Sequence, residues 1–169
     1  MKTTEKEKYV PALSFDFLTP FYDTAIKWTT REAVFKEKLA GQIEIPADGG
    51  RLLDLACGTA TLTVLLKRKF PRADVHGLDG DPKILKIARR KAEASGVEIK
   101  FAEAFSTALP YPDEFFDSVV SSLFFHHLTS ENKRKTLLEV GRVLKAGGAL
   151  HVADWGRPGN FLMRLASTP

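Results

Sequence analysis

Cysteine is scarce in this chain, and long apolar runs are absent. Its 169 residues include one thiol, Cys57, which excludes an internal disulfide and a metal site built from a cysteine cluster. No uninterrupted apolar stretch exceeds three residues, whereas a helix that crosses a bilayer needs ~20. Residues 1–17 carry charges but no apolar signal core. We therefore expect a cytoplasmic protein with neither a membrane span nor a bound metal.

The composition is that of one compact globular unit with a basic balance. Hydrophobic residues make up 44% and charged residues 27%, which supplies enough apolar surface for a core. The formal net charge is +4, and residues 67–91 hold nine basic against three acidic side chains. Such a stripe can steer towards RNA, an anionic membrane or an acidic partner. Ile84, Ile87 and Ala88 recur at helical spacing beside these charges. We therefore favour the interpretation that the basic residues form the solvated face of an amphipathic helix.

From Asp54 to Asp154, short apolar runs alternate with amphipathic helical stretches, a pattern typical of a βαβ series with a parallel sheet. Asp81 as a cap, Pro82 in the first turn and Gly96 after the last turn mark one helix clearly. We expect five strands, at residues 51–56, 74–78, 97–102, 116–121 and 149–154. We expect helices at residues 20–29, 31–43, 82–95 and 130–145, and a further helix after the first strand.

A hinge divides the predicted fold into two parts. Residues 46–50 read Pro-Ala-Asp-Gly-Gly, and proline and glycine at this density interrupt regular structure. We predict that residues 1–46 form an N-terminal helical flank or lid and that residues 47–169 form the sheet domain.

Ligands of an open parallel sheet bind outside the carboxyl ends of its strands, so the residues after each strand are the functional candidates. The first strand turns through Gly58 into a helix, with Asp54 four residues before the turn. A glycine there lets the backbone approach a ligand, and the helix that follows offers free N–H groups. The second strand places Asp79 at its tip, where a carboxylate can accept both hydroxyls of a ribose.

Two further strand ends carry polar side chains. Glu103 follows the third strand, and the fourth strand ends in Ser121 and Ser122, with His126 and His127 shortly after. Either histidine is a candidate catalytic base near neutral pH, or it closes the loop or caps the next helix. Two adjacent histidine side chains do not both point inward, so at most one of them fills the catalytic role.

Four segments in this chain resemble the class I S-adenosylmethionine-dependent methyltransferases, in particular the small-molecule branch with the ubiquinone and menaquinone C-methyltransferases. They are LDLACGTA, HGLDGDP, LPYPDEFFDSVVSS and LKAGGALHVADW, spread over about residues 50–156. The resemblance implies an α/β fold, a Rossmann-like doubly wound parallel sheet with flanking helices, in which residues 47–169 bind the cofactor. It implies an enzyme that transfers a methyl group from S-adenosyl-L-methionine to a small, apolar or aromatic acceptor and releases S-adenosyl-L-homocysteine.

The resemblance also gives roles to the residues at the strand ends. The loop from Ala56 to Thr59 would wrap the methionine part, Asp79 would bind the ribose hydroxyls, and Gly80 would leave room beside the adenine. Glu103 and the Ala104 backbone would read the adenine edge. The residues implied for the cofactor are Tyr22, Asp54, Ala56, Cys57, Gly58, Thr59, Asp79, Gly80, Glu103, Ala104, Phe105, Ser121 and Ser122.

Some of these residues also have a purely structural interpretation. Tyr22 either faces the sulfonium with its ring or packs between helices. Asp54 either meets the cofactor or only ties the turn to backbone amides. Cys57 is expected to serve as a small side chain and not as a nucleophile, because a reactive cysteine needs surroundings that favour the thiolate.

The sequence departs from the family pattern at the turn and at the C-terminus. Ala56 and Ala60 stand where many members have glycine, and Glu103 stands where aspartate is frequent. The C-terminal antiparallel strands that members place against the fifth strand are missing before Pro169. Because soluble proteins cover an apolar strand edge, we expect either a fragment of a longer protein or a partner chain. A homodimer through the edge of the fifth strand is one such arrangement.

Two other functions compete with methyl transfer to a small-molecule substrate. A truncated sheet is consistent with a non-catalytic module that binds S-adenosylmethionine or a protein partner. A nicotinamide-dependent oxidoreductase also has an acidic residue about twenty positions after a glycine turn. The turn Ala-Cys-Gly-Thr-Ala-Thr, however, lacks the glycines that bring backbone onto a pyrophosphate. A nucleic-acid substrate is not expected, because Ser121-Ser122-Leu123-Phe124 stands where an Asn-Pro-Pro-aromatic motif would.

Overall fold

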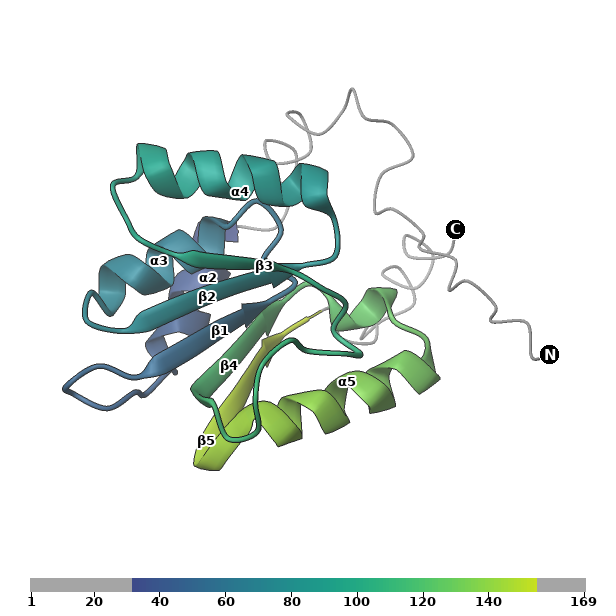
Figure 1. Cartoon of the computed structure of the whole chain (residues 1–169). Coiled ribbons are helices and arrows are strands. Elements are labelled where there is room, and N and C mark those ends of the chain that lie inside the picture. The colour runs from purple at the N-terminus through teal and green to yellow at the C-terminus, as the bar shows by residue number, and fades with distance from the viewer. Residues whose placement is uncertain (1–31, 155–169) are drawn as a thin grey trace, which may run out of the picture. The chain divides into compact units, whose positions relative to one another are not determined.

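Five short strands form a parallel sheet in the computed structural model, which describes residues 32–154 (Figure 1). The strands are β1 (Arg51–Leu55), β2 (Asp74–Asp79), β3 (Lys100–Glu103), β4 (Phe116–Ser122) and β5 (Leu144–Ala153). Their order is β3-β2-β1-β4-β5, and every neighbouring pair is parallel. The chain order reverses between β1 and β4. This arrangement confirms the doubly wound α/β fold expected from the sequence.

Helices connect the strands and cover both faces of the sheet (Figure 1). They are α2 (Glu32–Gly41), α3 (Thr61–Lys69), α4 (Pro82–Ala94), the 3-10 turn η1 (Phe125–His127) and α5 (Ser130–Val143). The start of α4 is as expected, because Asp81 Oδ1 accepts the backbone N–H groups of Lys83 at 2.8 Å and Ile84 at 3.4 Å. The helix expected over residues 20–29 lies outside the described residues.

Alternate residues of β1 supply two apolar cores, one on each face of the sheet. On one face, Leu52 packs with Leu66 of α3 and Leu39 of α2. On the other face, Leu53 packs with Val140 of α5. Burying a leucine side chain contributes roughly 1.5–3 kcal/mol relative to exposure. β1 is therefore anchored from both sides, which fixes the position of the loop that leaves its carboxyl end.

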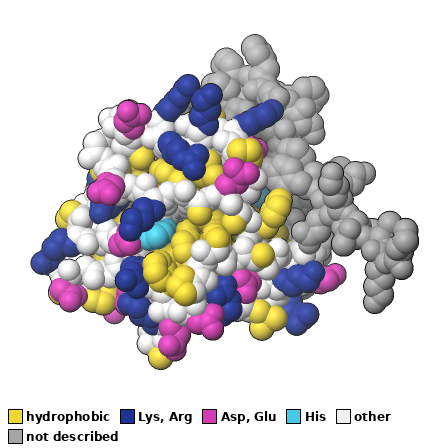
Figure 2. Space-filling view, in the orientation of Figure 1, with side chains coloured by type: hydrophobic (Ala, Val, Ile, Leu, Met, Phe, Trp, Pro, Cys, Tyr) yellow, Lys and Arg dark blue, Asp and Glu magenta, His cyan; other side chains and the backbone are white. Residues whose placement is uncertain are grey.

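The basic residues of α4 lie on its solvent side. Lys83, Lys86, Arg89 and Arg90 are exposed, whereas Leu85 on the same helix is buried. Figure 2 shows Lys and Arg side chains gathered over this helix. The arrangement is that of the amphipathic helix predicted from the spacing of its apolar residues. Across residues 32–154, no helix combines the length and the apolarity needed to cross a membrane.

Helix α5 ends, and β5 begins, earlier than the sequence predicts. α5 stops at Val143 because the backbone N–H groups of Glu114 and Phe115 donate to its last carbonyls, at 2.9 and 2.8 Å. The register between β4 and β5 shifts between Phe116 and Ser118. The Ala-Gly-Gly segment that was expected to end the helix therefore lies inside β5. The remaining strand boundaries fall within three residues of those expected.

Strand β5 is the outer strand of the described sheet. Within residues 32–154 it pairs with β4 alone, and no strand there runs antiparallel. Residues 1–31 and 155–169 lie outside the described part of the chain. The division of the chain at residue 46 therefore stays a prediction.

Candidate functional site

The loop between β1 and α3 follows a tight left-handed path. Ala56, Gly58 and Ala60 have φ values of 59°, 54° and 63°, a region that favours glycine. Holding an alanine there costs about 1 kcal/mol. Two backbone hydrogen bonds of 2.9 Å fix the loop, from the Cys57 N–H to the Leu78 carbonyl and from the Ala60 N–H to the Cys57 carbonyl. The loop thus keeps its left-handed course although two of its residues carry a Cβ.

Asp79 lies at the tip of β2 and contacts that loop. Its Oδ2 accepts the Gly58 N–H at 2.9 Å, and its Oδ1 accepts the Asp81 N–H at 3.0 Å. Burial raises the pKa of the Asp79 carboxyl, while these backbone hydrogen bonds oppose the rise. A carboxylate offers about four acceptor positions, so each oxygen keeps capacity for another donor. Asp79 therefore joins the loop to the strand tip and can still accept two hydroxyl groups.

Asp54 is buried in β1, just before the loop. Its side chain accepts the Thr63 hydroxyl at 2.6 Å through Oδ2, and the residue is 1% exposed. Its Oδ1 is buried and has no hydrogen-bond partner among the described residues. Burial raises the pKa of Asp54 to about 7, and the hydrogen bond from Thr63 opposes that rise. The site therefore contains a carboxyl group with one unsatisfied acceptor atom.

The tips of β2 and β3 lie side by side. Asp79 and Glu103 are register partners, and the Ala104 N–H donates to the Asp79 carbonyl at 3.2 Å. The Phe105 side chain is 53% exposed, and a Cβ added to Gly80 would lie 3.2 Å from its ring. Gly80 thus gives an aromatic ring room to lie close to the backbone. Gly80, Glu103 and Ala104, the residues predicted for the adenine side, share this corner of the sheet with Phe105.

A lysine from α4 reaches the loop. Lys91 Nζ donates to Thr59 Oγ1 at 2.9 Å and to Thr61 Oγ1 at 2.8 Å. Thr59 belongs to the loop and Thr61 is the first residue of α3, so one ammonium group ties α4 to the start of α3.

The described residues offer neither a reactive thiol nor a metal site. Cys57 is buried in the loop, and burial raises the pKa of its thiol far above the ordinary range, with Asp54 and Asp79 adding to the effect. A thiol held neutral is a poor nucleophile. Among residues 32–154, no three His, Cys, Asp or Glu side chains are grouped so that they could hold a metal ion.

The two serines at the end of β4 lie in different surroundings. Ser121 is fully buried, and its Oγ donates to the Leu55 carbonyl at 3.0 Å. Its hydroxyl therefore links β4 to β1 across the point where the chain order reverses. Ser122 is the last residue of β4 and is partly exposed.

His126 is paired with a carboxylate that was not predicted from the sequence. Its Nδ1 lies 2.6 Å from Asp154 Oδ1, and its backbone N–H donates to Asp154 Oδ2 at 3.0 Å. The His127 ring lies against the His126 ring, with centroids 3.9 Å apart. Burial lowers the pKa of His127, and the neighbouring His126 lowers it further. Asp154 directly follows β5, so the strand-end rule that singled out the other residues also points to it.

The structure places the predicted residues that it describes along the carboxyl edge of the sheet. Tyr22 lies outside the described residues. Thr63 binds Asp54, and Lys91 binds Thr59. Neither Thr63 nor Lys91 was predicted, because the fold brings each of them to its partner and the local sequence does not specify the pair. The residues at this edge are Asp54, Ala56, Cys57, Gly58, Thr59, Asp79, Gly80, Glu103, Ala104, Phe105, Ser121, Ser122, His126 and His127.

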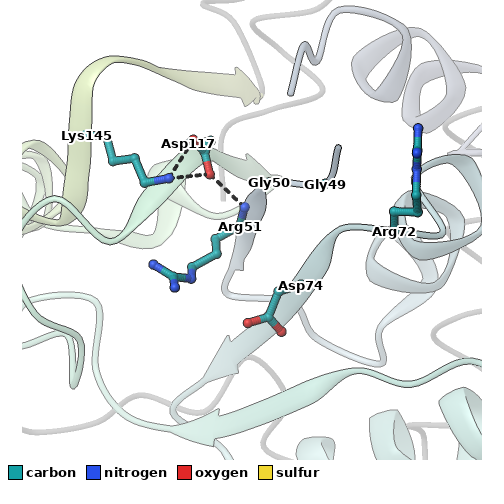
Figure 3. A pocket seen from close by; sticks show the side chains of 7 residues that line it. All are labelled: Gly49, Gly50, Arg51, Arg72, Asp74, Asp117 and Lys145. Atoms are coloured by element: carbon teal, nitrogen blue, oxygen red, sulfur yellow. Dashed lines mark hydrogen bonds and ion pairs between the residues drawn. The ribbon is translucent and has the colours of Figure 1, made fainter. Parts of the chain in front are cut away.

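A polar pocket of about 330 Å³ opens at the opposite, amino edge of the sheet (Figure 3). Asp117 accepts Lys145 Nζ at 2.7 and 2.8 Å and the backbone N–H of Arg51 at 2.8 Å. These contacts tie the amino ends of β1, β4 and β5 together. Its lining residues are Gly49, Gly50, Arg51, Arg72, Asp74, Asp117 and Lys145.

The chain is similar in sequence to proteins named as methyltransferases of demethylmenaquinone or of ubiquinone and menaquinone biosynthesis. The demethylmenaquinone methyltransferase of Thermus thermophilus is 46% identical over 108 residues, which cover 64% of this chain and 48% of that protein. The ubiquinone/menaquinone biosynthesis C-methyltransferase UbiE of Pectobacterium carotovorum is 37% identical over 111 residues, covering 64% and 43%. The chain thus spans about half the length of the curated relatives it matches.

Solved structures and family comparison agree with this likeness. The crystal structure of YcgJ from Bacillus subtilis superposes with a TM-score of 0.67 at 26% sequence identity, over 78% of this chain and 54% of that one. Residues 52–148 match the family described as "Methyltransferase domain", and this segment contains the loop after β1 and the tips of β2, β3 and β4. The chain belongs to this methyltransferase domain family.

Proposed function

We propose that the chain binds S-adenosylmethionine along the carboxyl edge of its sheet and takes part in methyl transfer to a small, apolar or aromatic acceptor. The observation that carries the proposal is the Asp79 carboxylate, which holds the Gly58 N–H and keeps acceptor capacity on both oxygens. The strand order reverses between β1 and β4, and this supports the same location, because ligands of doubly wound sheets bind at such a reversal.

Three features of the site fit the chemistry of this cofactor. Asp79 can accept the two hydroxyls of a ribose in charge-assisted hydrogen bonds. The buried, unpartnered Oδ1 of Asp54 fits a cationic donor such as the α-ammonium group of methionine. Gly80 and Phe105, just after β2 and β3, add close backbone and a partly exposed aromatic side chain beside Asp79, where a planar base would lie.

When bound, S-adenosylmethionine supplies an electrophilic methyl carbon, whose bonding pair stays on the sulfur as the acceptor's electron pair forms the new bond. The chain's contribution is to orient the acceptor and to exclude water, because an in-line transfer depends chiefly on alignment. The loop held by Asp79 and by Lys91 provides a fixed backbone for this purpose. Its two left-handed alanines are held in an unfavourable conformation by the surrounding hydrogen bonds and not by their own preference.

The names of the relatives and the residues near the end of β4 support the proposed acceptor class. The two curated relatives are named for menaquinone or ubiquinone precursors, which carry an aromatic ring. Phe124 and Phe125 follow β4 after one intervening residue, are half-buried, and pack edge to face with centroids 5.7 Å apart. An apolar aromatic acceptor matches such surroundings. A nicotinamide dinucleotide does not match, because the loop has one glycine where a pyrophosphate site needs three.

A calorimetric titration with S-adenosylhomocysteine tests the proposal. Replacing Asp79 with Asn removes the charge and one acceptor oxygen, so we expect the affinity to fall about ten- to hundredfold, because one charged hydrogen bond is worth about 1.5–3 kcal/mol. Asp74→Asn is the matched control, since Asp74 begins the strand that Asp79 ends, and it should leave the affinity unchanged. Circular dichroism checks that both variants fold.

Two results would contradict the proposed function. One is an unchanged affinity for S-adenosylhomocysteine in the Asp79→Asn variant, which would remove this carboxylate from the site. The other is a wild-type chain whose melting temperature rises with NAD and not with S-adenosylhomocysteine.

A further inference from the structure

The tips of β4 and β5 bring a histidine and a carboxylate together. Ser122 and Ala153 are register partners at the ends of the two parallel strands, so the residues that follow them leave the sheet side by side. His126 then lies in η1, and Asp154 is the first residue after β5. These two positions are 28 residues apart in the sequence, and the sheet makes them neighbours.

Asp154 contacts His126 through both of its oxygens. Oδ1 lies 2.6 Å from Nδ1 of the ring, and Oδ2 accepts the backbone N–H of His126 at 3.0 Å. A carboxylate is an acceptor only, so the ring must carry its proton on Nδ1 to make the shorter contact. The remaining nitrogen, Nε2, then presents a lone pair. The Asp154 side chain is 14% exposed and the His126 side chain 30% exposed, so the pair is sheltered but reachable.

Among the described residues, no carboxylate is recorded in a hydrogen bond to the His127 ring. Its ring lies tilted at 42° against the His126 ring. The charged groups that act on it are His126 and Asp154, after the larger effect of burial. A histidine whose tautomer is fixed by a carboxylate is the better base of the two, because its free nitrogen is held in one orientation.

We propose that Asp154 is a positioning residue that fixes the tautomer of His126, and that His126 takes a proton from an acidic hydroxyl of the methyl acceptor. This inference rests on the proposed function and narrows its substrate to a phenol or hydroquinone. The O–H bond of the acceptor breaks, its electron pair stays on the acceptor, and a new N–H bond forms at Nε2 of His126. The proton later passes to solvent.

The proton transfer supplies the nucleophile that the reaction needs. Negative charge from the ionised hydroxyl spreads over the conjugated ring, and either the oxygen or a ring carbon takes the methyl group. Where carbon takes it, that carbon loses its own proton to solvent, and the oxygen regains a proton from solvent, so that one proton is released overall. General-base catalysis of this kind contributes about 10²–10⁴ in rate, which sets the size of the effect expected when it is removed.

The first experiment reads the tautomer in the ligand-free chain of 169 residues. Long-range proton–nitrogen correlation spectra of ¹⁵N-histidine-labelled protein at pH 8 should show His126 with its proton on Nδ1. Asp154→Asn should change that signature, and Asp154→Glu should restore it. Asp74→Asn removes the carboxylate next to His76 at the opposite edge of the sheet and should leave the His126 signals unchanged. Wild-type His126 protonated on Nε2 would overturn the proposal.

The second experiment separates positioning from binding, with 1,4-dihydroxynaphthalene as acceptor and methyl-labelled S-adenosylmethionine. We expect Asp154→Asn to lower kcat about a hundredfold with KM and S-adenosylhomocysteine affinity near wild type. His126→Gln should lower kcat at least as far, and the double variant should lose no more than His126→Gln alone, because Asp154 acts through His126.

The outcomes distinguish this inference from the proposed function. A chain that binds S-adenosylhomocysteine normally but keeps full kcat in Asp154→Asn would refute the positioning role and leave the methyltransferase assignment intact. A double variant with a further large loss would also refute it, since Asp154 would then act independently of His126. Failure of the wild type to bind S-adenosylhomocysteine at all would instead refute the proposed function.

Discussion

Replacing Asp54 with Asn should make the ligand-free protein more stable at alkaline pH and weaken its hold on the cofactor. The native carboxyl is buried, has an unpartnered Oδ1, and has a pKa raised by burial to about 7. The same group in the unfolded chain titrates near 3.8. Between these two values the folded protein therefore binds a proton that the unfolded chain releases. Its unfolding free energy must fall as the pH rises through this window.

The size of that fall follows from the difference between the two pKa values. One pKa unit corresponds to about 1.4 kcal/mol, so roughly three units give a loss of up to about 4 kcal/mol from below pH 4 to above pH 7. About two thirds of it falls between pH 5 and pH 8. Asparagine has no proton to release, so this part of the pH dependence should disappear in Asp54→Asn.

Urea unfolding of both proteins at pH 5 and pH 8 checks this expectation. The variant's stability relative to wild type should improve by roughly 3 kcal/mol between the two pH values. Taking the difference cancels the contributions of His76 and His127, whose lowered pKa values act on both proteins alike. Affinity for S-adenosylhomocysteine should fall in the variant, because a buried anion no longer faces the ammonium group. An identical pH dependence in the two proteins would refute the assignment of a raised pKa to Asp54.

Two further substitutions test the contacts around the sheet. Asp117→Asn should lower the unfolding free energy by about 1–2 kcal/mol at pH 7, because it removes the charge and one of the two oxygens that accept Lys145 Nζ and the Arg51 N–H. Desolvation opposes ionisation of Asp117, but the Lys145 hydrogen bonds lower its pKa overall, below the ordinary 3.8. The loss should therefore be complete above about pH 4 and shrink as the pH falls through that lowered pKa, so urea unfolding should give a smaller difference between variant and wild type at pH 3 than at pH 7. Lys91→Met should weaken S-adenosylhomocysteine binding about fivefold through a looser loop, and calorimetry with no change in affinity would count against that role.

The sheet could be predicted from the sequence because its signals are local. Apolar runs such as Leu52-Leu53 and Val119-Val120 alternate with amphipathic stretches. The residues that cap α4 lie next to it in the sequence. The end of α5 could not be predicted in this way. Its last carbonyls are taken by Glu114 and Phe115, and this long-range backbone pairing stops a helix that local propensity would have continued.

In the candidate site, too, positions that depend on the local sequence could be predicted, and contacts that depend on the fold could not. Asp79 could be placed at a strand tip from its position after an apolar run, and the structure puts it there. The partners of the site residues come from other elements: Thr63 for Asp54 and Lys91 for Thr59. Nothing in the local sequence specifies such pairs. Asp154 differs, since it follows β5 directly and the strand-end rule applies to it as well.

Asp154 at the carboxyl edge of the sheet is paired with His126, but Asp54 and Asp79 at that edge lie in surroundings opposite to those of Asp74 and Asp117 at the amino edge. This contrast locates the site independently of any motif. At the amino edge, desolvation opposes ionisation of Asp74 and Asp117, but ion pairs with Lys100 and Lys145 lower both pKa values overall. At the carboxyl edge, burial raises the pKa of Asp54, and Asp79 keeps acceptor capacity beyond its two backbone contacts. A fold maintained for stability alone has no reason to bury a carboxyl with an unpartnered oxygen, because such burial costs free energy. A ligand with a cationic group and two adjacent hydroxyls supplies the missing partners, which is why the carboxyl edge, and not the more strongly paired amino edge, is where binding should be sought.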